Sequence, residues 1–306
     1  MVSMNITEGE LDYDIPGITK KCKTWYRIYG ELSSSTIPLV CLHGGPGARS
    51  DYLHIPMENL SRKYGITVIV YDQIGCGRST WLTEKKGDTG FFVPELFVNE
   101  LYNLIAKLNI KQWNLYGQSW GGMLGSQIAS LRPQGLNKLV ISNSPANMHD
   151  WVKSCDMWRA ELPKEVEQTL LKHERDCTYN DPEYKKACDV FYERHLCRTL
   201  PWPEAVRMTN VWIDENPTVY HTMNGPTEFH VIGPLKDWDT SEAVKKIEVE
   251  TLVISAFYDE GKEFVSAPFF KGIPKCKWVT LMESSHMSMW EEGEKYNKLV
   301  ADFLQY

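Results

Sequence analysis

The stretch WNLYGQSWGG, residues 113–122, decides the fold class of this chain of 306 residues. An apolar run of strand length is followed by the pattern G-x-S-x-G, with Ser119 at its centre, and then by helical spacing over 121–132. A serine on such a turn projects from the backbone, and the partial positive charge of the following helix lies beneath it. This order of elements predicts a nucleophilic serine in an α/β protein.

Short β-rich runs alternate with helix-length segments on both sides of this turn. Strands are expected at 24–29, 38–42, 67–71, 113–116, 138–142, 251–255 and 277–281, and helices at 93–108, 121–132 and 291–303. Several of the β-runs are continuously apolar, as strands covered on both faces are. The alternation predicts a doubly wound, mostly parallel sheet.

The composition and the periodicity of the sequence change between residues 146 and 239. The β-runs disappear there, and tryptophan, cysteine and charged residues at helical spacing take their place. Because strands resume afterwards, we expect one α/β core made of residues 1–145 and 240–306. The segment 146–239 is expected to be a helical cap, or lid, inserted into that core.

The partners of the serine can be placed by their order along the chain. A serine hydroxyl is a weak nucleophile until a base takes its proton. In a protein with this serine turn, an acid and then a histidine follow, each just past a later strand. Asp259 follows the run 251–255, and His286 follows the run 277–281. The sequence therefore predicts Ser119 as nucleophile, Asp259 as acid and His286 as base.

Other carboxylates and imidazoles compete for these roles. Glu260 adjoins Asp259, and Glu283 precedes His286. The remaining histidines, none of which follows a late strand, are His43, His54, His149, His173, His195, His221 and His230. We expect surface or structural roles for these histidines.

A glycine-rich loop, LHGGPGARSDY at residues 42–52, follows an early strand. In this architecture such a loop supplies one backbone N–H of the oxyanion hole, and the residue after the nucleophile supplies the other. Glycine lets an amide face the substrate oxygen without a side chain in the way. The expected donors are the amides of Trp120 and Gly45, with Gly44 as the alternative to Gly45.

Composition excludes several classes of function. The net charge of 33 − 40 = −7 disfavours binding to nucleic acid or to anionic membranes. The N-terminus lacks the pattern of a signal peptide, and no apolar run is long enough to span a membrane. The eight cysteines show no metal-type spacing, so we expect no metal, and no motif calls for a cofactor. Without a secretion signal, we expect a cytoplasmic protein whose cysteines are free thiols. A disulfide among the four cysteines between 155 and 197 is the alternative for an exported protein. The sequence carries no signal for oligomeric state.

Four motifs together resemble those of the proline iminopeptidases. They are HGGPG (43–47), YDQIGCGRS (71–79), GQSWGG (117–122) and SHMSMWEE (285–292), and the resemblance extends from about residue 20 to the end of the chain. It implies the α/β-hydrolase fold with a helical cap. It also implies serine aminopeptidase chemistry with the nucleophile, acid, base and oxyanion donors named above.

The resemblance further implies a site for a free α-amino group. Members of the family bind this group through two carboxylates, one beside the catalytic aspartate and one in the cap. Glu260 and Glu228 match these positions, and Tyr220 matches a tyrosine near the amine. A carboxylate pair compensates an ammonium that leaves water, and the bound cation relieves the repulsion within the pair. Without the resemblance, the simpler interpretation of Glu260 is a residue of a solvated acidic loop, and that of Glu228 is a surface charge.

The sequence also departs from the family pattern. Ile74 stands where many bacterial members have arginine, and Ser284-Ser285 stands where a glycine often precedes the histidine. These changes argue against strict specificity for proline, so the expected substrate is a small peptide or an amino-acid amide. Two alternatives remain: hydrolysis of an ester, a lactone or a specialised metabolite, and a non-catalytic binding protein. The intact set of catalytic residues disfavours the second.

Overall fold

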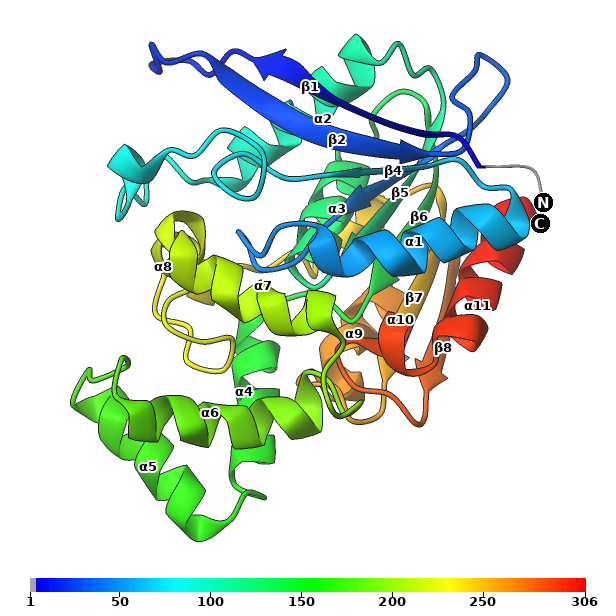
Figure 1. Cartoon of the computed structure of the whole chain (residues 1–306). Coiled ribbons are helices and arrows are strands. Elements are labelled where there is room, and N and C mark those ends of the chain that lie inside the picture. Colours follow the sequence, from blue (N-terminus) through cyan, green and yellow to red (C-terminus); the bar gives the residue numbers. More distant parts are fainter. Residues whose placement is uncertain (1–3) are drawn as a thin grey trace.

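One sheet organises the chain, as seen in a computed structural model that describes residues 4–306. Within this range eight strands pair in the order β1-β2-β4-β3-β5-β6-β7-β8 (Figure 1). The strands are β1 (Ile6–Tyr13), β2 (Cys22–Tyr29), β3 (Leu39–Leu42), β4 (Val68–Tyr71), β5 (Trp113–Gln118), β6 (Leu136–Ser142), β7 (Glu250–Ala256) and β8 (Cys276–Leu281). β2 is antiparallel to both β1 and β4, whereas all pairs from β4 to β8 are parallel. The predicted doubly wound, mostly parallel sheet is confirmed.

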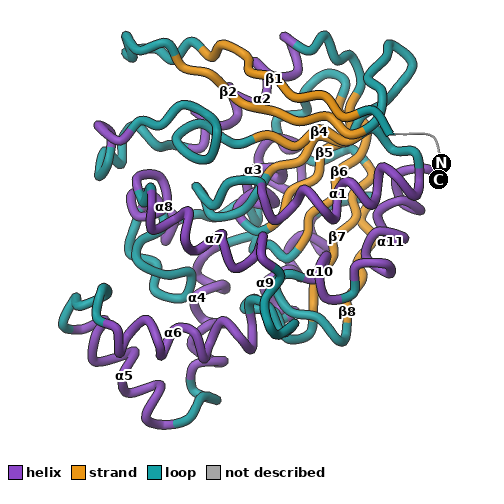
Figure 2. The backbone as a smooth tube through the Cα atoms, in the orientation of Figure 1, coloured by secondary structure: helices purple, strands orange, loops and turns teal. Residues whose placement is uncertain are grey.

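Helices cover both faces of the sheet (Figure 2). The helices of the core are α1 (Asp51–Tyr64), α2 (Pro94–Lys107), α3 (Trp120–Ser130), α9 (Glu263–Gly272), α10 (Ser288–Glu291) and α11 (Gly293–Gln305). In β3, Leu39 and Cys41 pack in one hydrophobic cluster with residues of α1 and α11, while Val40 and Leu42 pack with residues of α2 and α3. Successive side chains of a strand point to opposite faces, so a strand buried on both faces must be apolar throughout. This requirement explains the uninterrupted apolar runs in the sequence.

Among the elements that were not predicted, β1, α1 and α9 each have a local reason. β1 is an edge strand that pairs only with β2, and its sequence ITEGELDY is largely exposed and polar. Both α1 and α9 carry a proline within the helix, Pro56 and Pro268, and proline disfavours the helix interior. α1 also begins directly after the glycine-rich loop. Its sequence signal therefore merges with that of a turn.

The chain between β6 and β7 is helical, as expected from its composition. It forms α4 (Met148–Arg159), α5 (Lys164–Arg175), α6 (Pro182–His195), α7 (Glu204–Glu215) and α8 (Thr218–Met223), followed by the short 3-10 helices η2 (Pro234–Asp237) and η3 (Ala243–Lys246). Figure 1 shows α4 to α8, green to yellow, gathered on the side of the molecule away from the two termini. We call residues 146–239 the helical insertion.

Two further expectations can be compared with the described residues. Among residues 4–306 no helix combines the length and the apolar character that a membrane span needs. All eight cysteines are free thiols, as expected. The alternative, a disulfide among the four cysteines from Cys155 to Cys197, is therefore not observed.

Candidate active site

The turn between β5 and α3 holds Ser119 in a strained backbone conformation. Ser119 has φ of 55° and ψ of −125°, in the positive-φ region that side chains other than glycine rarely adopt. The turn is possible because the residues two positions before and two positions after Ser119 are glycines. A Cβ on Gly117 would lie 2.0 Å from the carbonyl oxygen of Gly121, and a Cβ on Gly121 would lie 2.2 Å from that of Leu42. The glycines of G-x-S-x-G are thus required by the close approach of strand and helix.

The predicted acid and base lie together past the ends of β7 and β8. His286 Nδ1 is 2.7 Å from Asp259 Oδ1, and both side chains are almost fully buried. Burial favours the neutral imidazole, but the Asp259 carboxylate and its hydrogen bond outweigh burial, so the pKa of His286 is raised. The hydrogen bonds of residues 4–306 join His286 to Asp259 but do not include the hydroxyl of Ser119. Catalytic hydrogen bonds often reach their final geometry only when a substrate is bound.

Asn143 supports the acid, and the sequence analysis missed it. It lies just past β6 at φ of 47°, and its Nδ2 donates to Asp259 Oδ2 at 2.8 Å. The same Nδ2 reaches the Ser285 carbonyl at 3.3 Å, while Ser288 Oγ donates to Asn143 Oδ1 at 2.7 Å. Asn143 thereby connects the turn that carries Asp259 to the loop that carries His286. An asparagine directly after a core strand was the available signal, because asparagine tolerates positive φ.

The glycine-rich loop approaches Ser119 as expected, but its two glycines differ. The amide of Gly44 donates to the hydroxyl of Tyr52 at 2.7 Å, and that hydroxyl donates to Gln118 Oε1 at 2.6 Å. This bond occupies the Gly44 amide and disfavours it as an oxyanion donor. Gly45, at φ of 110°, lines a cavity together with Ser119 and Trp120. Of the two glycines that the sequence left open as the oxyanion donor of this loop, the structure therefore favours Gly45.

Two of the motifs are joined behind this loop. The backbone amide of Gln73 donates to His43 Nε2 at 3.0 Å, and Gln73 Nε2 donates to the His43 carbonyl at 3.0 Å. Trp120 Nε1 then donates to Gln73 Oε1 at 2.9 Å. Burial lowers the pKa of His43, which keeps the ring neutral, and Nδ1 is left to donate to the Gly44 carbonyl at 2.9 Å. HGGPG and YDQIGCGRS thus form one hydrogen-bonded support beside the serine turn.

A pair of carboxylates lies next to His286, the predicted base. Ligand atoms of Glu228, Glu260 and His286 all lie within 4.8 Å of one another, and Glu260 Oε2 is 3.8 Å from His286 Nδ1. Both oxygens of Glu260 and Oε2 of Glu228 are buried, and within residues 4–306 no group outside the pair donates a hydrogen bond to them. Burial, and then the charge of Glu228, raise the pKa of Glu260 well above its ordinary value. Burial, and then the charges of Glu228 and Glu260, raise the pKa of Tyr220 well above its ordinary value.

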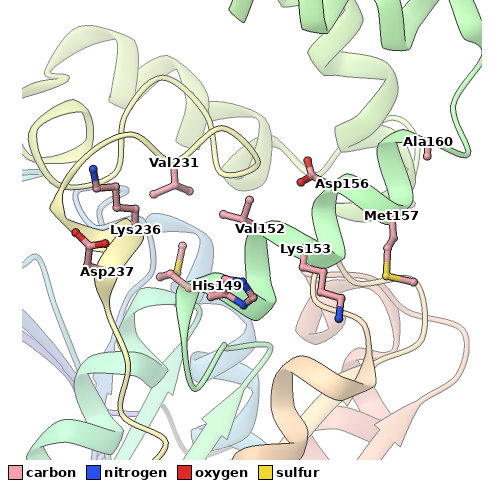
Figure 3. A pocket seen from close by; sticks show the side chains of 10 residues that line it. His149, Val152, Lys153, Asp156, Met157, Ala160, Val231, Lys236 and Asp237 are labelled. Atoms are coloured by element: carbon pink, nitrogen blue, oxygen red, sulfur yellow. The ribbon is translucent and has the colours of Figure 1, made fainter.

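The cavity at Ser119 is small and lies beside a larger cleft. About 20 Å³ of space is enclosed by residues that include Ser119, Trp151, Glu228 and Met148. On the outer side of α4 lies a cleft of about 700 Å³, whose lining residues on α4 and on the segment 231–237 are shown in Figure 3. Met148 lines both spaces. The thioether side chain of Met148 therefore separates the catalytic cavity from the outer cleft.

Comparison with known proteins agrees with this geometry. The family model for the alpha/beta hydrolase fold matches residues 37–178. The chain is 37% identical over 281 residues to a proline iminopeptidase of Saccharolobus solfataricus, covering 92% of this chain and 88% of that one. The chain belongs to the proline iminopeptidase family of α/β hydrolases.

Two solved structures resemble the whole chain. The proline iminopeptidase of Mycobacterium smegmatis superposes with a TM-score of 0.84 at 36% identity, covering 97% of both chains. The structure of VinJ superposes with a TM-score of 0.91 at 43% identity, covering 97% of this chain and 98% of that one. Within the proline iminopeptidase family, this chain therefore keeps the complete fold, including the helical insertion.

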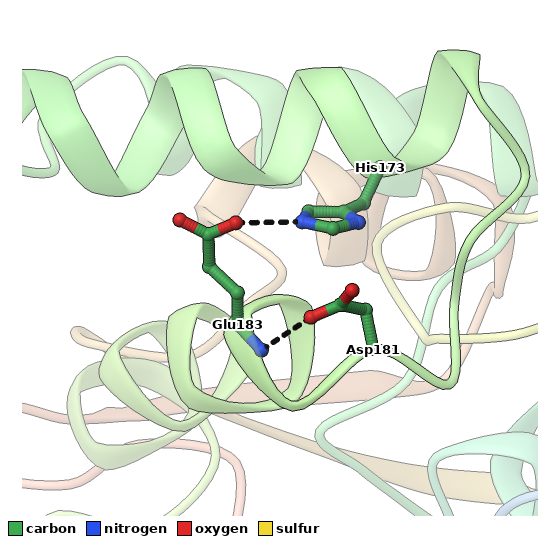
Figure 4. Close-up of side chains that lie close together, drawn as sticks. All are labelled: His173, Asp181 and Glu183. Carbon is green, nitrogen blue, oxygen red and sulfur yellow. Dashed lines mark hydrogen bonds and ion pairs between the residues drawn. The ribbon is translucent and has the colours of Figure 1, made fainter.

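A second cluster of potential metal ligands lies away from the serine. His173, Asp181 and Glu183 bring ligand atoms within 4.8 Å of one another at the junction of α5 and α6 (Figure 4). Asp181 caps α6 by accepting from the amide of Glu183 at 2.8 Å. Glu183 contacts His173 Nε2 and Lys172 Nζ, each at 3.2 Å. Helix capping and ion pairing account for these contacts, as they do at many helix starts.

Proposed function

We propose that this member of the proline iminopeptidase family is a serine hydrolase that cleaves the amide bond after an N-terminal residue with a free amino group. The carboxylate pair of Glu228 and Glu260 is the observation that carries this proposal. Buried polar atoms are normally hydrogen-bonded, and three carboxylate oxygens without partners beside a catalytic histidine point to a missing donor. An ammonium group supplies positive charge together with three donors.

The proposed chemistry follows from the positions of the groups. Ser119 Oγ attacks the carbonyl carbon of the first residue while His286 Nε2 takes its proton. The amides of Gly45 and Trp120 stabilise the oxyanion. His286 then protonates the leaving amine, and an acyl-enzyme remains. A water molecule, deprotonated by His286, attacks the acyl carbon and releases the amino acid and Ser119.

The proposed ammonium site selects substrates that have a free N-terminal amino group. An N-blocked residue offers neither the charge nor the three donors, so the buried carboxylates would stay unpaired. Tyr220 lies on α8 of the helical insertion, which we propose acts as a cap. Small peptides and amino-acid amides with a free N-terminus fit this arrangement.

The proposal is tested with free and N-acetylated aminoacyl arylamides, including prolyl and alanyl derivatives. Free substrates are expected to be cleaved, and N-acetylated ones to be cleaved at least tenfold more slowly in kcat/KM. The Ser119→Ala variant should lose turnover and should no longer react with a fluorophosphonate. Equal rates on free and blocked substrates would contradict amine recognition and favour an esterase or lactonase. A wild-type protein that does not react with the fluorophosphonate would contradict serine catalysis altogether.

A further inference from the structure

The turn after β7 is held in place by side chains of the helical insertion. Three consecutive carbonyl oxygens each receive a hydrogen bond from a side chain of the insertion. His195 Nδ1 is 2.9 Å from the Tyr258 oxygen, Trp158 Nε1 donates to the Asp259 oxygen at 2.8 Å, and Ser154 Oγ donates to the Glu260 oxygen at 2.6 Å. The donors come from α4 and from the last residue of α6. The backbone that carries the acid and the amine-binding carboxylate therefore rests on the insertion.

The loop after β8 is held by the same part of the insertion. The backbone amide of His286 donates to the His195 carbonyl at 3.0 Å, and that of Met287 donates to the Leu196 carbonyl at 2.9 Å. His195 therefore contacts both catalytic loops, one through its ring and the other through its backbone. Two backbone hydrogen bonds already join the loops where they leave β7 and β8, from Phe257 to the Leu281 carbonyl at 2.9 Å and from Tyr258 to the Ser284 carbonyl at 3.0 Å. His195 adds a further link, which comes from the insertion.

The ring of His195 is suited to a fixed, neutral role. It is buried, stacks on Trp158 with ring centroids 4.4 Å apart, and contacts Phe191. Burial is the main reason that the pKa of His195 is lowered to about 4, so the ring is neutral near pH 7. A carbonyl oxygen can only accept, so Nδ1 must carry the proton. The hydrogen bond to Tyr258 is therefore a donation from a neutral ring.

We propose that His195 is a positioning residue, assisted by Trp158, that sets the distance between the Asp259 turn and the His286 loop. This inference rests on the proposed function, since it concerns the alignment of the proposed acid and base. A displacement of about 1 Å in such a group lowers the rate about 100-fold, so a link of this kind acts on kcat. Substrate binding through Glu228 does not pass through His195.

A merely structural role makes a different prediction. If His195 only fills space in the insertion, its replacements should lower stability in proportion to the lost ring, whatever hydrogen bonds they keep. If it positions the loops, a side chain that keeps the donor should restore the rate even though it loses the ring. Asparagine meets this condition, because its Nδ2 can occupy the place of the histidine Nδ1.

The experiment compares His195→Ala with His195→Asn, and Trp158→Phe with Trp278→Phe. Trp278 is the matched control, since it is also half-buried and its Nε1 also makes a 2.8 Å hydrogen bond, to Ser255 Oγ. Each variant is measured for kcat and KM on a free aminoacyl arylamide, for the rate of reaction with a fluorophosphonate, and for its free energy of unfolding.

We expect His195→Ala and Trp158→Phe to lower kcat and the fluorophosphonate rate about 10- to 100-fold. Because Glu260 lies on the same turn and KM depends on it, the fluorophosphonate rate is the measurement that reports on Asp259 and His286 alone. His195→Asn should recover most of the rate, and Trp278→Phe should match wild type. Equal kcat in His195→Ala and wild type, or equal losses in His195→Ala and His195→Asn, would overturn the inference. If His195→Ala does not fold, the two tryptophan variants decide, because each replaces an indole by a smaller phenyl ring and removes one N–H donor. An unreactive wild-type protein would refute the proposed function, and the inference with it.

Discussion

Replacing Glu228 by glutamine is expected to change activity and stability in opposite directions. In the free protein, Glu228 Oε2 and both oxygens of Glu260 are buried without partners, and the two side chains lie within a few ångströms of each other. The variant removes one acidic group and offers an amide N–H₂ to Glu260. Leaving a buried polar group unsatisfied costs about 1–3 kcal/mol, so the variant should gain free energy of unfolding of that size.

The same change removes half of the proposed ammonium site. A hydrogen bond to a charged group contributes about 1.5–3 kcal/mol, which corresponds to a factor of about 10 to 150 in binding. We therefore expect kcat/KM for a free aminoacyl arylamide to fall by this factor, mainly through KM. The slow cleavage of the N-acetylated arylamide should stay the same, since that substrate has no ammonium to lose.

The assay pairs substrate kinetics with urea unfolding at the same pH. Glu283→Gln is the control, because it makes the same chemical change on an exposed carboxylate in the neighbouring loop. The control should match wild type in both measurements. The reasoning would be refuted if Glu228→Gln slowed the free and acetylated substrates by the same factor, or if its unfolding free energy were unchanged or lower.

Three further substitutions test other parts of the structure. Asn143→Ala removes the 2.8 Å donor to Asp259 Oδ2, so kcat should fall about 10- to 100-fold at unchanged KM in steady-state kinetics. Gly117→Ala would place a Cβ 2.0 Å from the Gly121 carbonyl oxygen, and urea unfolding should show a loss of about 3 kcal/mol or more. Glu100 is fully buried, and its burial raises its pKa to about 8. A folded-state pKa above the unfolded value means that stability is present at low pH and is lost as the pH rises toward 8. Glu100→Gln should therefore gain up to roughly 4 kcal/mol over wild type between pH 5 and pH 9 in urea unfolding, and a constant difference would contradict this assignment.

The sequence predicted those parts of the fold whose physics is local. Strands buried on both faces must be apolar, so several of the seven predicted strands could be read as continuous apolar runs, whereas β1 is an exposed edge strand and left no such run. The serine turn was visible because close packing at Gly117 and Gly121 leaves no room for side chains. α1 and α9 were missed because Pro56 and Pro268 interrupt the helical signal.

The proximity of Asp259 and His286 was predictable, but the residues that support them were not. Asp259 and His286 come directly after core strands, so their meeting follows from parallel pairing. The contacts of Asn143 and His195 depend on where separate loops and the helical insertion come to lie. Those positions are set by tertiary packing, for which a single sequence contains no spacing rule. The use of the Gly44 amide by Tyr52 depends on the register between the glycine-rich loop and α1 in the same way.

The cavity at Ser119 has a consequence for how the proposed substrate reaches the serine. Its space of about 20 Å³ accommodates about one water molecule. An aminoacyl group is several times larger than one water molecule, so wall residues such as Met148 must move before such a group reaches Ser119. Under the proposed function, substrate entry and a movement of Met148 on α4 therefore belong to one event.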